Sequence, residues 1–300
     1  MRISTQILFE SGASGIGDLQ SSLMKTQQQI ATGRRILTPS NDPVAAARAL
    51  EVTQSQSLNT QYGINRQHAR STLEATEGTL ASVISLMQDV KSTVIAAGNG
   101  TLSDAERGFM AADLGGRLDE LLGLANIRDA VGNYMFAGFQ TTAPAFSKDA
   151  LGVVTYDGDQ GQRLLQVDAT RQMAVGNPGS AVFQGGGQDV FKTMNDLIAL
   201  LNTPGTAGLA AGLATANADM DLALGNVLTV RASVGSRLKE LDALDNAGED
   251  RNLQYSQVLS DLQDLDYTQA LTQLSQQQIT LEAAQRSFVT VSGLSLFNFL

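Results

Sequence analysis

The side chains best suited to acid–base chemistry are three pairs of acidic residues that lie close together in the sequence. They are Asp119/Glu120, Glu249/Asp250 and Asp261/Asp264. Two neighbouring carboxyl groups can act as general acid and general base when their surroundings move their pKa values apart. Each pair falls on the polar face of an expected helix or beside a break, where water keeps both groups ionised. We therefore interpret the pairs as solvated charge and predict no catalytic residue and no enzyme activity.

The sequence gives no more support for a metal site than for acid–base catalysis. The chain holds one histidine, His68, and no cysteine, so it lacks the ligands of the usual zinc sites. An EF-hand loop needs an oxygen ligand at position 5, Gly at position 6 and Glu at position 12, whereas counting from Asp157 finds Gly161, Gln162 and Asp168 there. We predict a solvated helix face for His68, a hairpin turn at 157–161, and neither a metal nor a cofactor.

Composition excludes further classes. The chain has 300 residues and a formal net charge of −10. Clustered Lys and Arg are what bind phosphate backbones and anionic lipid surfaces, so we predict no nucleic acid and no membrane among the partners. No run approaches the roughly 20 apolar residues of a spanning helix. The start, MRISTQILFESGASG, lacks the apolar core of a secretory leader, which taken alone suggests the cytoplasm.

Two proline-free stretches, 44–143 and 205–300, can hold long helices because proline breaks helix interiors. Apolar residues recur in both at the seven-residue spacing of helices packed lengthwise in a bundle. In the first stretch the repeat ends at Gly98-Asn99-Gly100, a helix stop, and Ser103 is placed to cap a new helix. The repeating residues are Leu73, Leu80, Met87 and Val94 with Thr76, Val83, Val90 and Ala97; Leu114, Leu118, Leu121 and Ala125; and Met220, Val227, Val234 and Leu241.

The middle of the chain changes character. Short alternating runs at 153–156, 163–167 and 173–175 are strand candidates, separated by Gly, Asp, Asn and Pro. We predict a mainly α protein: a long helical bundle formed from both chain ends, with a small β-rich unit inserted in a surface loop. The predicted domains are 1–44 with 262–300 as terminal assembly helices, 45–138 with 190–261 as a helical bundle, and 139–189 as the β-rich insertion.

Both ends carry a narrow apolar stripe among Gln, Ser and Thr, and a stripe this narrow needs a partner. The two stripes could pair with each other, and the apolar tail 294–300 is a candidate for burial in an interface. Arg34 and Arg35 could meet acidic groups of a neighbouring subunit or lie in a solvated loop. The residues predicted to form an assembly interface are Ile16, Leu19, Leu23, Ile30, Arg34, Arg35, Tyr267, Leu274, Leu281, Phe288, Val291, Phe297, Phe299 and Leu300.

Several passages resemble the bacterial flagellin superfamily. Ile30-Ala31-Thr32-Gly33-Arg34-Arg35-Ile36-Leu37-Thr38-Pro39-Ser40-Asn41-Asp42-Pro43 is similar to the family's entry after its first helix, and Asp264-Leu265-Asp266-Tyr267 with the Gln-rich repeats behind it is similar to the other end. Within the family, three passages resemble the hook–filament junction branch. They are Met1-Arg2-Ile3-Ser4-Thr5-Gln6, Gly132-Asn133-Tyr134-Met135-Phe136-Ala137-Gly138-Phe139-Gln140-Thr141 and Ser295-Leu296-Phe297-Asn298-Phe299-Leu300.

The resemblance implies an extracellular part of the bacterial flagellum, exported unfolded through the flagellar type III apparatus, and so reverses the cytoplasmic inference. It implies self-assembly into a tubular layer that joins the first hook-associated protein to flagellin. It also implies an export chaperone, for which the apolar tail is a plausible docking site.

We therefore predict a structural adaptor at the hook–filament junction that assembles through its end helices. A flagellin-type filament subunit and a secreted helical adhesin or scaffold stay open as alternatives, and an enzyme is a remote third.

Overall fold

The computed structural model describes residues 2–150 and 152–297. The chain clusters into two compact units, one made of residues 1–58 and 250–300 and the other of residues 59–249. The predicted class, mainly helical with a small β part in the middle of the chain, is confirmed. The predicted three-part division into domains uses other boundaries and stays a prediction.

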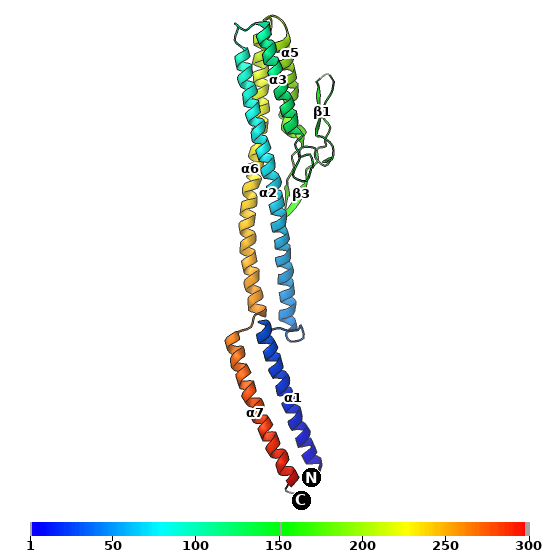
Figure 1. The fold of residues 1–300 in the computed structure, drawn as a ribbon, viewed down its shortest axis with the longest axis vertical. Helices are drawn as coiled ribbons and strands as arrows, with labels where there is room; N and C mark the ends of the chain where they lie inside the picture. The colour runs from blue at the N-terminus through cyan, green and yellow to red at the C-terminus, as the bar shows by residue number, and fades with distance from the viewer. Residues whose placement is uncertain (1, 151, 298–300) are drawn as a thin grey trace. The chain divides into compact units, whose positions relative to one another are not determined.

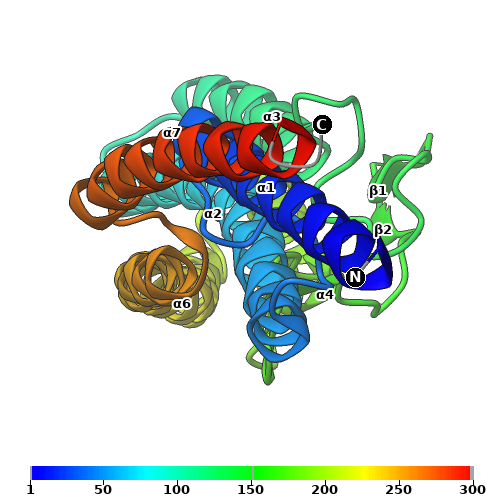
Figure 2. The ribbon, with the colours of Figure 1, turned by 90° about the horizontal axis from the view of Figure 1, so that it is seen from below.

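In the first unit, helix α1 (Arg2–Thr32) packs against helix α7 (Tyr267–Phe297). Figures 1 and 2 both show the two helices side by side, α1 in blue and α7 in red. The first unit also holds the beginning of α2 (Pro43–Ala97) and the end of α6 (Leu209–Gln263). The predicted pairing of the two apolar end stripes is thereby confirmed.

Local chemistry sets where these helices end and begin. Gly33 has φ +69° and follows the last residue of α1, the left-handed conformation that glycine adopts most easily and that ends many helices. Asp42 caps α2, because its Oδ1 accepts the N–H of Ala45 at 3.0 Å. Pro43 then occupies the first helical position, where its missing N–H costs nothing.

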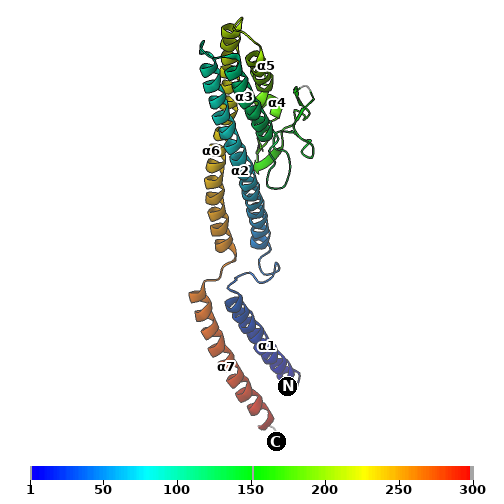
Figure 3. The same ribbon diagram turned by 45° about the horizontal axis from the view of Figure 1, so that its top comes forward.

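The second unit is built around the helices α2, α3 (Asp104–Ala125), α5 (Val190–Asn202) and α6, with α3 packed on α5. Figure 3 shows α3 and α5 beside each other and the short helix α4 (Gly179–Phe183) close by. Ser103 caps α3 with a capping box closed by Glu106, as the sequence predicts. All sixteen apolar or threonine positions of the predicted repeats, from Leu73 to Leu241, are buried.

By length and composition alone, α2 could cross a membrane, since an 18-residue window in it has a mean hydropathy of 1.2. This differs from the expectation that no segment approaches a spanning helix. The window is 44% buried, and α2 supplies Leu73, Leu80, Met87 and Val90 to the core of the second unit. The need to fill that core accounts for the composition of the helix.

The β part consists of two separate antiparallel pairs. Strand β1 (Phe146–Lys148) pairs with β2 (Val154–Tyr156), and β3 (Leu164–Asp168) pairs with β4 (Arg171–Ala174). Three of the four strands overlap the predicted runs; β1 was not predicted. The prediction of a hairpin turn at 157–161 is wrong, because β2 and β3 do not pair with each other.

The segment 157–161 instead folds back onto the loop that follows α3. The Asp159 carboxylate accepts the N–H groups of Phe139 (2.9 Å) and Gly161 (2.7 Å). A side chain on Gly138, which has φ +71°, would lie 2.2 Å from Asp159 Oδ1. The 132–141 motif therefore joins the helices to the β part, and it needs glycine at this point.

A cluster of aromatic rings lies behind this joint. Phe136 packs edge-on against Phe183 at 5.4 Å between ring centroids, and Phe146 contacts Phe183, Phe191 and Tyr156 at 5.0 to 5.5 Å. Burial raises the pKa of Tyr156, whose hydroxyl donates to Asp159 O at 2.6 Å. The motif singled out in the sequence thus contributes Met135, Phe136 and Ala137 to the core of the second unit.

Candidate assembly interface

The α1–α7 pair is closed at one end by backbone hydrogen bonds. The N–H of Leu265 donates to Gly33 O at 3.0 Å, and the N–H of Arg35 donates to Gln263 O at 2.8 Å. Arg34 and Asp264 form an isolated antiparallel bridge between these bonds. Each chain end therefore enters its helix at a position fixed by the other end.

Two glycines, Gly12 within α1 and Gly33 directly after it, show the register of the pair. A Cβ on Gly33 would lie 2.9 Å from Tyr267 Oη, and a Cβ on Gly12 would lie 2.8 Å from the Phe288 ring. In both pairs the two residue numbers total 300. The same offset places the predicted stripes opposite each other, as Ile16 with Ala284, Leu19 with Leu281, Leu23 with Gln277, Thr26 with Leu274, and Ile30 with Ala270.

Burial agrees with this register. Among the residues of α1 and α7 whose side chains the structure describes, Thr26 (3% exposed) and Ala270 (4% exposed) are the buried ones. The larger apolar stripe residues on both helices are half-buried. A two-helix pair can shield only one side of each residue in its seam, so the stripes gain part of the stabilisation that a full bundle would give.

The seam contains a polar layer in its middle. Gln277 Nε2 donates to Ser22 Oγ at 2.8 Å, while Gln277 Oε1 is buried without a hydrogen-bond partner among the described residues. The hydroxyl of Thr26, which is also buried, donates a hydrogen bond to Ser22 O of the same helix at 3.1 Å. An unpaired buried amide oxygen costs stability but disfavours other registers.

The open end of the pair is aromatic. Phe9 and Phe288 lie 4.9 Å apart between ring centroids, tilted by 45°, and Gly12 leaves room for the Phe288 ring. Phe9 remains 55% exposed. This end therefore keeps apolar surface in contact with water.

The predicted interface residues fall into three groups. Ile16, Leu19, Leu23, Ile30, Leu274, Leu281 and Phe288 are half-buried in the seam, whereas Arg34, Arg35, Tyr267 and Val291 are exposed. The side chain of Phe297 and the whole of Phe299 and Leu300 lie outside the described residues. The side chains of the apolar tail 294–300, which was predicted to be covered, lie outside them too.

Arg35 has an intramolecular role that the sequence analysis did not foresee. Its Nη2 donates to Leu262 O at 2.8 Å, and its Nη1 lies 3.4 Å from the carboxylate of Asp42, the cap of α2. The guanidinium thus ties the loop after α1 to the end of α6. Contact with a neighbouring subunit stays a prediction for both arginines.

Besides the predicted Tyr267 and Val291, the structure shows exposed apolar residues that the sequence analysis missed. They are isolated among polar neighbours and carry no periodic signal of their own. Those described in the first unit that are at least half exposed are Ile7, Phe9, Met24, Val44, Leu50, Leu253, Leu271, Ile279 and Val289. Side chains of this kind mark surfaces that contact other proteins when they gather in one region.

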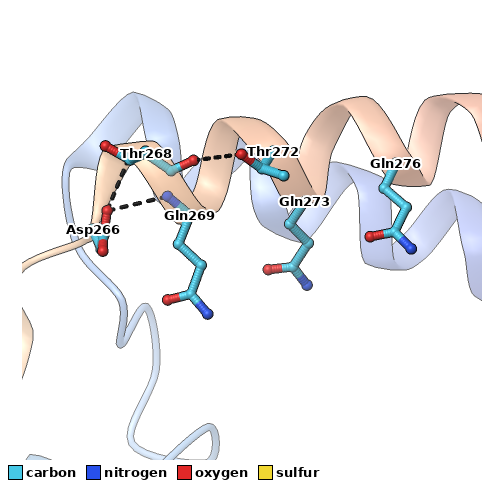
Figure 4. A pocket seen from close by; sticks show the side chains of 6 residues that line it. All are labelled: Asp266, Thr268, Gln269, Thr272, Gln273 and Gln276. Carbon is cyan, nitrogen blue, oxygen red and sulfur yellow. Dashed lines mark hydrogen bonds between the residues drawn. The ribbon is translucent and has the colours of Figure 1, made fainter.

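An open polar groove lies at the start of α7, lined by Asp266, Thr268, Gln269, Thr272, Gln273 and Gln276. Asp266 caps the helix by accepting the N–H groups of Thr268 (2.9 Å) and Gln269 (3.1 Å). Figure 4 shows Gln269, Gln273 and Gln276 projecting on the same side of the helix. One carboxylate among amides and hydroxyls can form hydrogen bonds but offers no acid–base pair.

The charge of the end helices differs from that of the whole chain. Helix α1 contains two basic and two acidic residues, and α7 contains one of each, Arg286 and Glu282. Both helices are therefore neutral in a chain of net charge −10. Neutral helices can approach identical copies without the repulsion that an acidic surface would cause.

Ionisable residues elsewhere stabilise the structure. Arg66 is buried and ion-paired to Asp245, and Arg70 lies 2.9 Å from the same carboxylate. Although burial alone would raise it, the two arginines hold the pKa of Asp245 below its usual value. His68 and the six residues of the acidic pairs are exposed, and the described part of the chain has no cluster of three metal-ligating acids or histidines.

The comparisons with known proteins agree with this geometry. Residues 3–141 match the family model for the bacterial flagellin N-terminal helical region, which defines the class as flagellin-like. The chain belongs to the family of flagellar hook-associated protein 3, because it is 36% identical to that protein of Salmonella typhimurium and of Escherichia coli K12, over 99% of each chain. A flagellin from Escherichia coli O127:H6 is 27% identical over 40% of this chain.

Solved structures show the same fold. A flagellar hook-associated protein from Vibrio parahaemolyticus superposes with a TM-score of 0.69 at 26% identity, over 75% of this chain and all of the other. The flagellar junction protein from Legionella pneumophila gives 0.62 at 21% identity, over 72% of this chain and all of the other.

Proposed function

We propose that this chain is a structural subunit of the bacterial flagellum that forms an adaptor at the hook–filament junction and assembles through its terminal helices. The observation that carries the proposal is the full-length similarity to flagellar hook-associated protein 3. The flagellin similarity covers less than half of the chain, which favours the junction over the filament.

Assembly is proposed to proceed through the α1–α7 pair. Its seam is half-buried, its outer faces keep apolar side chains in water, and both helices are neutral. These properties support packing against copies of the same chain in a tubular layer, with the first hook-associated protein and flagellin on either side. Export through the flagellar type III apparatus with a chaperone on the apolar tail completes the proposal, and no catalytic role is included.

The test uses a strain that lacks the gene. We expect hooks without attached filaments and full-length flagellin shed into the medium. Complementation with L274D/L281D should not restore filaments, because two carboxylates in the seam separate the end helices. The purified variant should keep the helical signal of the second unit.

The matched control is Q278D/Q285D, which adds the same charges at the same spacing on exposed positions of α7 and should restore motility. Normal motility with L274D/L281D would refute assembly through the terminal helices. Long filaments grown from seeded monomers would favour the flagellin alternative. Secretion in a strain without the flagellar export apparatus would favour an adhesin or scaffold.

A further inference from the structure

The chain contains one Asn-Gly pair, Asn99-Gly100, and one Asp-Gly pair, Asp157-Gly158. In both, the backbone nitrogen of the glycine can attack the side-chain carbonyl carbon of the preceding residue, because glycine has no Cβ to hinder the approach. The product is a five-membered succinimide. The structure holds these two pairs in opposite ways.

Asn99 lies in the turn between α2 and α3, and Asn99, Gly100 and Thr101 are all exposed. Asn99 Oδ1 accepts the N–H of Thr101 at 3.2 Å and its hydroxyl at 2.9 Å. The ring closed by the first of these bonds includes the nitrogen of Gly100, so the side-chain carbonyl is held next to that nitrogen. Both donors also draw electrons from the carbonyl that would be attacked and stabilise the oxyanion that forms.

Gly100 is free to react. A Cβ built on it would meet nothing within 4 Å, and its N–H makes no hydrogen bond within the described part of the chain. Its nitrogen can therefore lose its proton to solvent hydroxide. The flanking backbone bonds, from Asn99 N–H to Ala96 O at 3.2 Å and from Leu102 N–H to Asn99 O at 3.1 Å, both lie within this short turn and do not tie it to a distant segment.

Asp157-Gly158 is clamped instead. A Cβ on Gly158 would lie 2.6 Å from Tyr156 Oη and 2.9 Å from Ala137 O. The N–H of Asp157 donates to Ala145 O at 2.9 Å, and the N–H of Asp159 donates to Ala137 O at 3.3 Å. Ring closure here would have to move the backbone on both sides.

We propose that Asn99 is a site of spontaneous deamidation that the fold presents, while the fold protects Asp157 from the related isomerisation. The Gly100 nitrogen forms a bond to Asn99 Cγ, the bond from Cγ to Nδ2 breaks, and ammonia leaves with the proton taken from Gly100. Water then opens the succinimide at either carbonyl and gives an aspartyl or an isoaspartyl residue at position 99.

The experiment compares folded and unfolded full-length chain. Both are incubated at mildly alkaline pH, one in buffer and one in guanidinium chloride. Peptides around positions 99 and 157 are then quantified by mass spectrometry and by labelling with an isoaspartyl-specific methyltransferase. We expect position 99 to react at least as fast in the folded chain as in the unfolded chain, and position 157 to react several-fold more slowly when folded.

Three variants complete the test. T101V removes the hydroxyl donor and G100A adds a Cβ in open space; each should slow the reaction at position 99 several-fold without changing the unfolding temperature. N99Q is the control that should remove it. Slower reaction at position 99 in the folded chain than in the unfolded chain would overturn the proposal, as would unchanged rates in both T101V and G100A.

Discussion

Gly33 combines two requirements in one residue. Its φ of +69° ends α1, and the hydroxyl of Tyr267 occupies the space where a side chain would begin. Its carbonyl also receives the N–H of Leu265. A single residue therefore sets the end of one helix and the start of its partner, and with them the register of the seam.

Replacing Gly33 with alanine should destabilise the α1–α7 pair by about 1–3 kcal/mol, because a non-glycine residue is strained at positive φ and the new methyl group would press on Tyr267. Hydrogen exchange at 267–275 should become faster while the second unit is unaffected. Gly17, which is helical with open space around it, is the matched control. Its change to alanine should stabilise α1 by about 0.5–1 kcal/mol. Unchanged exchange in G33A would show that the closed end does not depend on this glycine.

At the scale of elements, the end helices pair through a seam that is only partly apolar. The polar layer at Gln277 and Ser22 interrupts the stripes on both helices. A polar layer of this kind lowers stability and raises the preference for one register. The α1–α7 pair is therefore expected to be weak but to favour a single register. This combination suits helices that complete their packing with neighbouring subunits.

Substitution of Gln277 tests whether the polar layer lowers the stability of the pair while it fixes the register. Q277L removes the buried amide oxygen that lacks a partner and should stabilise the pair by about 1 kcal/mol, measured by thermal unfolding followed at the end helices. Q278L, on an exposed position of the same helix, should have no such effect. Since the chain has no cysteine, an engineered disulfide between positions 19 and 281 can report the register in each variant. A less stable Q277L would mean that the amide is satisfied and the polar layer is a source of stability.

At the scale of the molecule, packing and charge are divided between the two units. The buried core of apolar side chains lies in the second unit, and the first unit contributes Ala45, Ala49 and Ala270 to the buried apolar residues. Residues 59–249 hold 13 basic and 21 acidic residues and so carry −8 of the net charge of −10. The second unit therefore combines the apolar core with a charge that repels its copies, whereas the first is nearly neutral and its described residues include few that are apolar and buried.

Hydrogen exchange of the monomer should reflect this division. Amides of 73–94, 114–121 and 220–241 should exchange only on global unfolding, while those of 2–32 and 267–297 should exchange through local opening, since local stability follows buried contacts. Mass spectrometry of peptides after timed exchange measures both. Equal protection of the two sets would show that the end helices are stable before assembly.

The sequence alone determined most of the helical architecture. Seven-residue repeats placed Leu73, Leu80 and Met87 in the core, and Gly98 and Ser103 marked helix boundaries, because periodicity and capping are local properties of the chain. The stripes on the two ends also indicated correctly that they pair, since a narrow stripe has to be covered.

Tertiary structure decided what depends on residues far apart. That Gly12 and Gly33 face Phe288 and Tyr267, and that Arg35 ties its loop to the end of α6, follow from a register that no local pattern encodes. The role of 157–161 was mistaken for a hairpin turn because turn residues look alike, whether they join paired strands or pack on a distant loop. The exposed apolar side chains outside the seam became visible only once the fold showed which faces remain uncovered.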